Sequence, residues 1–173
     1  IEHQQMDEFK KLSRKALNFV FLVASPMMIY FMLFAKQGIY FLSGDAFGPA
    51  VVPMQLIMPT LLLIGITNIL GIQILVPLGY EKAVLVSEIV GAVIDLVVNA
   101  LLIPVYQSSG AAIGTLLAEF AVMVVQCIAL KNEIKTAFSD IKYLKIILAI
   151  IIASLASFWV TALNLHVFIT LVI

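Results

Sequence analysis

Charged residues are scarce in this sequence. Of its 173 residues only 12% are Asp, Glu, Lys or Arg, whereas 63% are hydrophobic. Soluble domains are about 25% charged and about 45–50% apolar, so a chain this poor in charge cannot cover a water-facing surface. We therefore expect a protein integral to a membrane. Its ten basic and ten acidic residues cancel, which argues against nucleic acid as a partner.

Motifs for catalysis or metal binding are also missing. The single cysteine, Cys127, lies in an apolar run and is interpreted as a small buried side chain. His3 and His166 lie near the ends without partners at metal-ligand spacing. The chain has no Gly-rich phosphate loop and no Ser–His–Asp candidate. We therefore expect that the protein is not an enzyme and that it binds no metal and no cofactor. Coupling of transport to H⁺ or Na⁺ stays open.

Long apolar runs dominate what remains. A transmembrane helix needs about 20 mainly apolar residues, and the runs predict an all-α, polytopic transmembrane helix bundle with five complete spans and the start of a sixth. The first run is longer than a signal-peptide core of about 7–15 residues and lacks a cleavage site, so it is predicted to span. The expected spans are 17–34, 50–76, 83–103, 110–130, 145–163 and 166–173. The sequence opens at Ile1 and stops inside an apolar run, so we interpret it as a fragment.

Basic residues predict the orientation of these spans. Alternating sides places nine of the ten Lys and Arg residues on one side and leaves only Lys36 opposite. Positive residues accumulate on the cytoplasmic side, so we expect the amino end to be cytoplasmic. Residues 1–16 form an expected cytoplasmic amphipathic connector, which either lies on the anionic inner leaflet or simply joins helices.

Proline and glycine interrupt the first two spans. Proline removes a backbone hydrogen bond and kinks a helix, and bent helices are common in transporters that change shape. Membrane helices also carry more Pro and Gly in general, so both interpretations stay open. The candidate hinges are Pro26, Pro53, Pro59, Gly65 and Gly71.

Polar side chains recur inside the apolar runs. Glu88, Asp95 and Asn99 fall within roughly 40° of one another on a helix. Glu119 and Gln126 share a face of the next span, and the second span contributes Asn68 and Gln73. Ionisable residues at bilayer depth are rare and usually face a bundle interior or a transport pathway. We therefore predict that these side chains line a substrate or ion pathway.

Three roles remain open for this polar set. In the first, the side chains form hydrogen bonds between helices and hold the bundle together. In the second, Asp95 or Glu119 binds a cation or a proton. In the third, the polar set binds the hydroxyls of a sugar. Gly110 and Gly114 form a GxxxG pattern that predicts close helix packing. Glu88 lies near the expected inner end of its span, where it can reach water.

Three stretches of the sequence carry a resemblance to a known family, namely FLSGDAF, NILGIQILVPLGYEK and above all NALLIPVYQSSGAAIGTLLAE. With the residues around them, about three-quarters of the chain resembles the later half of polysaccharide flippases, the O-antigen and capsule exporters of the superfamily that also holds multidrug exporters. The last stretch is similar to the family's Asn, Leu-Ile-Pro, aromatic and Gly-Ala-Ala pattern closed by a Glu. It departs from the usual Tyr-Gly, because Tyr106 is followed here by Gln107.

The resemblance implies the second bundle of a two-bundle transporter in a bacterial or archaeal cytoplasmic membrane. Its implied activity is to flip an undecaprenyl-diphosphate-linked oligosaccharide to the outer leaflet by alternating access, for surface polysaccharide biosynthesis. The implied partners are the bilayer, this lipid-linked substrate and an N-terminal bundle of the same chain. A cation-coupled small-molecule or multidrug exporter is the alternative. A membrane glycosyltransferase, a polymerase or a structural subunit fits the short loops and the polar set less well.

Overall fold

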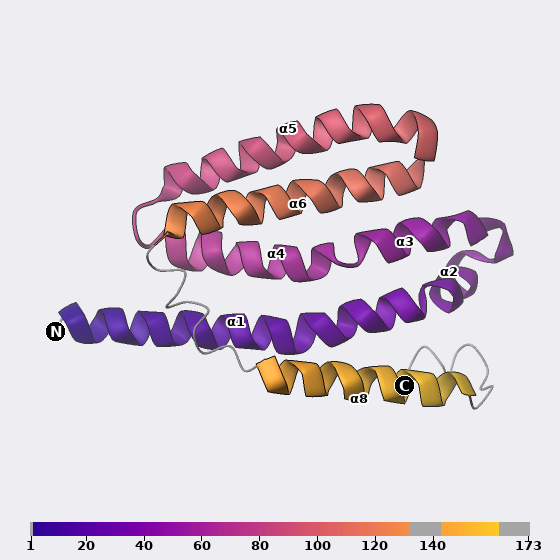
Figure 1. The fold of residues 1–173 in the computed structure, drawn as a ribbon, viewed down its shortest axis with the longest axis horizontal. Coiled ribbons are helices and arrows are strands. Elements are labelled where there is room, and N and C mark those ends of the chain that lie inside the picture. The colour runs from indigo at the N-terminus through magenta and orange to yellow at the C-terminus, as the bar shows by residue number, and fades with distance from the viewer. Residues whose placement is uncertain (1, 132–142, 163–173) are drawn as a thin grey trace.

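The computed structural model describes residues 2–131 and 143–162, and every element within them is helical. Figure 1 shows long helices lying side by side, with α5 and α6 along one edge and α8 along the other. The helices are α1 (Glu2–Leu33), α2 (Ala35–Ser43), α3 (Val51–Ile57), α4 (Thr60–Asn68), α5 (Glu81–Tyr106), α6 (Ser108–Leu130) and α8 (Tyr143–Ala162), with a 3₁₀ turn η1 (Asp45–Ala50) and a π-helix η2 (Ile69–Leu75).

Four helical stretches are long and apolar enough to cross a membrane. They are Met6–Leu33, Asp45–Leu75, Glu81–Tyr106 and Ser108–Leu130, and each overlaps one of the first four predicted spans. The described part of α8 contains a shorter apolar stretch, Leu144–Leu155, which falls below that length. The predicted fifth span at 145–163 is therefore not confirmed. The predicted sixth span at 166–173 lies outside the described residues.

Helix α1 is continuous through the residues expected to form a separate connector. It has 32 residues, which at 1.5 Å per residue is about 48 Å, whereas the hydrocarbon core of a bilayer is about 30 Å thick. Pro26 lies inside α1 without ending it. The amino-terminal turns of α1 therefore extend the first apolar helix beyond what a membrane core can cover.

The packed core lies where α1, the α4–η2 segment and the end of α6 meet. Leu17 of α1 is fully buried there. It packs in one cluster with Ile66, Ile69, Leu70, Ile74, Leu75 and Leu130. Gly65 of α4 faces α1, and a Cβ at this position would lie 2.6 Å from Val20 Cγ1. Gly65 thus sits inside an unbroken helix at a close contact between helices.

The second apolar stretch is segmented at a proline. Helix α3 ends at Ile57, α4 begins at Thr60, and Pro59 between them has no N–H to continue the ladder. The Thr60 hydroxyl donates a hydrogen bond to the Ile57 carbonyl at 2.6 Å. Pro53 instead lies in the first turn of α3, where helices tolerate proline. Pro59 is the candidate hinge at which the helix is interrupted.

Helices α5 and α6 make the most extensive contact between any two described elements. Gly110 lies against the α5 backbone, so that a Cβ there would meet the Leu102 carbonyl oxygen at 2.5 Å. Gly114 faces Asn99 one turn further along. The two glycines of the GxxxG pattern thus lie where α6 approaches α5. This pairing sets the polar faces of both helices beside each other.

Candidate functional site

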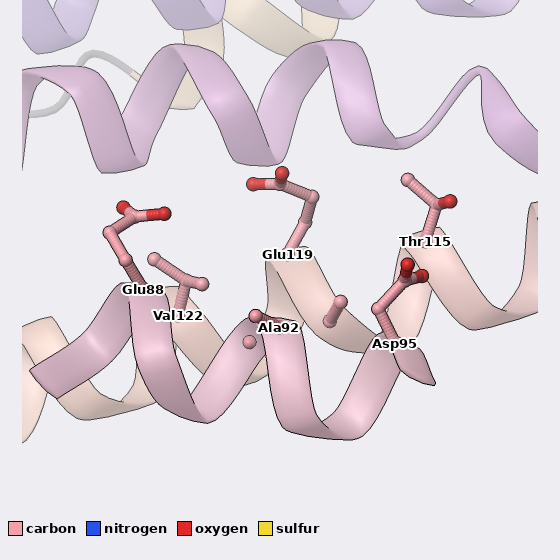
Figure 2. Close-up of a pocket in the computed structure, with 8 residues that line it drawn as sticks. Glu88, Ala92, Asp95, Thr115, Glu119 and Val122 are labelled. Atoms are coloured by element: carbon pink, nitrogen blue, oxygen red, sulfur yellow. The ribbon is translucent and has the colours of Figure 1, made fainter. Parts of the chain in front are cut away.

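Two pockets collect most of the predicted polar residues, and Glu88 and Glu119 line both. Glu88 comes from the first half of α5 and Glu119 from the middle of α6. Figure 2 shows their carboxylates pointing toward the ribbon of the neighbouring helix, which has the purple of α4. Side chains far apart in the sequence are thus brought to one place by the packing of α5 on α6.

The α5–α6 pocket lies in the groove between these two helices and has a volume of about 240 Å³. Asp95 and Thr115 line it beyond the two glutamates, as Figure 2 shows. Its remaining lining residues are Gly91, Ala92, Ala118 and Val122. Gly91 lets α5 approach α6 closely here, since a Cβ at this position would lie 2.5 Å from a Val122 methyl group.

The three-helix pocket lies between the α4–η2 segment, α5 and α6 and has a volume of about 220 Å³. Its polar lining consists of Thr67 and Asn68 from α4, Glu88 from α5, and Glu119 and Gln126 from α6. Ile64, Gly71, Ile72 and Val84 complete it. Because both pockets include Glu88 and Glu119, these carboxylates separate two neighbouring polar spaces.

Gln126 is almost completely buried, with 1% of its surface exposed, and its hydrogen-bond partner Ser87 is fully buried. Its Nε2 donates to the hydroxyl of Ser87 at 3.3 Å, and its Oε1 has no hydrogen-bond partner among the described residues. Gly71 makes room for this amide, because a Cβ at Gly71 would lie 2.9 Å from Gln126 Nε2. Burying an amide oxygen without a partner is costly.

Asp95 and Asn99 lie one turn apart on α5 beside Gly114. Asp95 Oδ1 and Asn99 Oδ1 are both buried and have no hydrogen-bond partner among the described residues. Asn99 lines neither pocket. It lies against α6 instead, since a Cβ on Gly114 would collide with its Oδ1. The α5 polar face therefore continues past the pocket into the contact with α6.

Asn68 and Gln73, predicted together from one span, are separated by the structure. Both side chains are exposed, but Asn68 lines the three-helix pocket and Gln73 lines neither pocket. The intervening residues belong to the π-helix η2, whose i to i+5 bonding is continued by Val76 N to Gly71 O at 3.0 Å. A π-helix changes the angle between successive side chains, so an even α-helical spacing does not describe this segment.

The charge of the site is negative. Neither set of lining residues contains Lys or Arg. Within the part of the chain that is described, no group of three or more His, Cys, Asp or Glu residues is arranged to hold a metal ion. The pockets offer carboxylate, amide and hydroxyl groups, which suit hydroxyls or cationic groups rather than phosphate.

Three hydroxyl residues at the site were not predicted from the sequence, namely Thr67, Ser87 and Thr115. The pattern that found the other residues used only carboxylates and amides inside apolar runs. Ser87 precedes Glu88, Thr67 precedes Asn68, and Thr115 follows Gly114, so each adjoins a residue that was singled out. Hydroxyl residues are common in membrane helices and bond their own backbone, which weakens them as a sequence signal.

Comparison of the chain with protein-family models, with curated proteins and with solved structures gives no match. The resemblance to polysaccharide flippases therefore rests on the sequence motifs alone.

Proposed function

We propose that this protein is a membrane transporter that flips an undecaprenyl-diphosphate-linked oligosaccharide from the inner to the outer leaflet. The observation that carries the proposal is the convergence of polar side chains from three apolar helical segments on two adjoining pockets. Sugar headgroups cannot cross hydrocarbon without replacing the hydrogen bonds they make to water. Carboxylate and amide oxygens at bilayer depth supply acceptors for sugar hydroxyls along such a path.

In this proposal the chain forms most of the second bundle of a two-bundle transporter. The bundle has five complete spans and the start of a sixth, and its amino end lies on the cytoplasmic side of a bacterial or archaeal plasma membrane. Alternating access exposes the pockets to one leaflet and then the other. The pyrophosphate requires cationic partners, and because the two pockets contain none, we assign that role to the other bundle.

A second candidate is a cation-coupled exporter of small molecules. Acidic pockets without Lys or Arg favour it, since Glu88, Asp95 and Glu119 attract cations rather than anions. The two candidates differ in cargo. Loss of surface polysaccharide identifies the first, whereas loss of resistance to toxic organic cations with polysaccharide intact identifies the second.

Asp95→Asn tests the proposal in cells whose surface polysaccharide depends on the intact protein. The change keeps the size of the side chain and removes its charge within the α5–α6 pocket. We expect surface polysaccharide to be lost while the amount of protein in the membrane stays normal. Immunoblotting of membranes and extraction of surface polysaccharide measure the two quantities.

Asp45→Asn is the matched control, because Asp45 is exposed in η1 and lines neither pocket. We expect it to leave the polysaccharide unchanged. Normal polysaccharide in the Asp95→Asn strain would refute a transport role for this carboxylate and would leave helix packing as the role of Asp95.

A further inference from the structure

Each side-chain donor group around the three-helix pocket makes a hydrogen bond within the protein. Asn68 Nδ2 donates to the Ile64 carbonyl at 2.9 Å, and the Thr67 hydroxyl donates to the same carbonyl at 3.2 Å. Gln126 Nε2 donates to Ser87 Oγ at 3.3 Å, and Ser87 in turn donates to the Val84 carbonyl at 2.6 Å. Each of these donors thus makes one hydrogen bond within the protein, and the carboxylate and amide oxygens of the pocket lining remain as acceptors.

One acceptor without a partner lies buried behind the wall of the pocket. Gln126 is 1% exposed, and its Oε1 has no partner among the described residues. A buried amide oxygen forms a hydrogen bond whenever a donor can reach it, because the alternative costs free energy. A ligand donor meets this oxygen when the Gln126 side chain, which helps to line the pocket, turns toward it.

Charge narrows the choice of donor. The carboxylates of Glu88 and Glu119 line the same pocket, with no Lys or Arg among the lining residues. Two neighbouring carboxylates repel each other unless a cation or a proton lies between them. A protonated amine has a positive charge and three N–H donors. Its charge pairs with the carboxylates, and one of its N–H groups donates to the buried amide.

The size of the pocket distinguishes an organic amine from a bare metal ion. Its volume is about 220 Å³, compared with about 30 Å³ for one water molecule in the liquid. Ile64, Ile72 and Val84 add apolar walls beside the acceptors. A carbon frame of the size of one sugar ring fits such a lining, whereas a bare ion would leave most of the space unfilled.

We infer that the three-helix pocket binds a primary ammonium group carried on a small hydroxylated molecule, and that in transport this is the amino group of a sugar within the oligosaccharide. The assignment to the oligosaccharide rests on the proposed function; the ammonium chemistry rests on the pocket. A free amino sugar and one joined in the oligosaccharide present the same group. Glu88 and Glu119 bind its charge, and Gln126 Oε1 accepts one of its N–H donors.

Binding of glucosamine to the full chain in lipid nanodiscs tests this inference. Titration calorimetry compares glucosamine with N-acetylglucosamine, which lacks the charge, at constant ionic strength and a mildly acidic pH that keeps the amine protonated. We expect glucosamine to bind at least about tenfold more tightly, the difference typical of one hydrogen bond to a charged group. Equal binding of the two sugars would overturn the inference. Binding of sodium ions by a protein that does not bind glucosamine would also overturn it.

Glu119→Gln and Glu88→Gln locate the site, and each should weaken glucosamine binding by about tenfold or more. Glu81→Gln is the matched control, since Glu81 begins α5 and lines neither pocket; its binding should equal that of the wild type. Elution as a single species in size-exclusion chromatography, with an unchanged melting temperature, establishes that a variant is folded. Wild-type affinity in both folded pocket variants would overturn the assignment.

The two proposals can fail separately. If glucosamine does not bind while Asp95→Asn still abolishes surface polysaccharide, the transport function stands and the ammonium site falls. If glucosamine binds through Glu88 and Glu119 while Asp95→Asn leaves the polysaccharide intact, the ammonium chemistry stands and its assignment to the oligosaccharide falls. For that assignment, cells should fail to export an amino-sugar repeat when Glu119→Gln is introduced and should still export a repeat without amino sugars; equal export of both would overturn it.

Discussion

Gln107 has a backbone conformation that L-amino acids rarely adopt. It joins α5 to α6 with φ 51° and ψ −127°, and among the described residues it is the one non-glycine whose φ lies well inside the positive range. Glycine adopts such angles without a steric penalty because it has no Cβ. The family pattern that the sequence resembles has glycine after the aromatic residue, so the departure at Gln107 coincides with local backbone strain.

Gln107→Gly should therefore stabilise the protein. Relief of strain at one such residue is worth about 1 kcal/mol or more, which should appear as a higher melting temperature in detergent. Gln107→Ala serves as the control, because it removes the same side chain but keeps the Cβ and should bring no gain. A stabilisation of equal size in both variants would mean that the side chain, and not the backbone, is responsible.

Gly110 and Gly114 differ in what surrounds them, which predicts different costs for the same substitution. A Cβ at Gly110 would meet the Leu102 carbonyl at 2.5 Å and the Ile103 nitrogen at 2.9 Å, and backbone atoms cannot move aside. At Gly114 the nearest atoms belong to the flexible side chain of Asn99.

Gly110→Ala should lower the melting temperature more than Gly114→Ala does. Overpacking of a tight contact costs about 1–3 kcal/mol, and we expect the first variant to fall in that range and the second below it. Equal melting temperatures would show that α5 and α6 separate easily and that neither glycine controls their approach.

At the scale of elements, the interruption between α3 and α4 is the feature that bears on the proposed transport. Pro59 provides no N–H, and the chain resumes as a helix at Thr60. A broken helix beside a polar pocket can bend without breaking further hydrogen bonds. Pro26 lies inside a continuous α1, Pro53 lies in the first turn of α3, and Gly65 and Gly71 pack against Val20 and Gln126.

Pro59→Ala should preserve the amount of protein and reduce export of surface polysaccharide, because alanine restores the missing N–H and lets α3 and α4 join. Pro104→Ala, near the end of α5, gives a comparison at a proline inside a continuous helix and should affect export less. Unchanged export in the Pro59→Ala strain would mean that this proline is one of the many that membrane helices tolerate.

At the scale of the whole molecule, the order of the four apolar stretches predicts which loops share a side. Lys82 follows the second stretch and Ser108 begins the fourth, so crossing once through α5 places them on opposite sides of a membrane. Basic residues favour the cytoplasm, and we expect Lys82 to be inside and Ser108 outside.

Labelling of single cysteines measures this orientation. With Cys127 replaced by Ala, a membrane-impermeant maleimide should label Ser108→Cys in intact cells, and should label Lys82→Cys only after the cells are made permeable. The Cys127→Ala protein without a second substitution gives the level of background labelling. Labelling of Lys82→Cys from outside would reverse the proposed topology.

Hydropathy and helical periodicity in the sequence were enough to predict four apolar helices and the polar face of α5. A chain in lipid must satisfy its backbone within each helix, so length and composition alone predict a span. The single face shared by Glu88, Asp95 and Asn99 follows from 3.6 residues per turn. These properties are local, and no knowledge of neighbouring helices is needed to derive them.

Only the tertiary structure decided which polar residues meet. Gln126 reaches Ser87 across the α5–α6 contact, and Asn68 lines a pocket that Gln73 does not. The π-helix η2 changes the rotation along its segment, and its position against α6 depends on the absence of a side chain at Gly71. Contacts between helices depend on the shapes of residues far apart in the chain. The pattern of residues along one helix therefore does not predict these contacts.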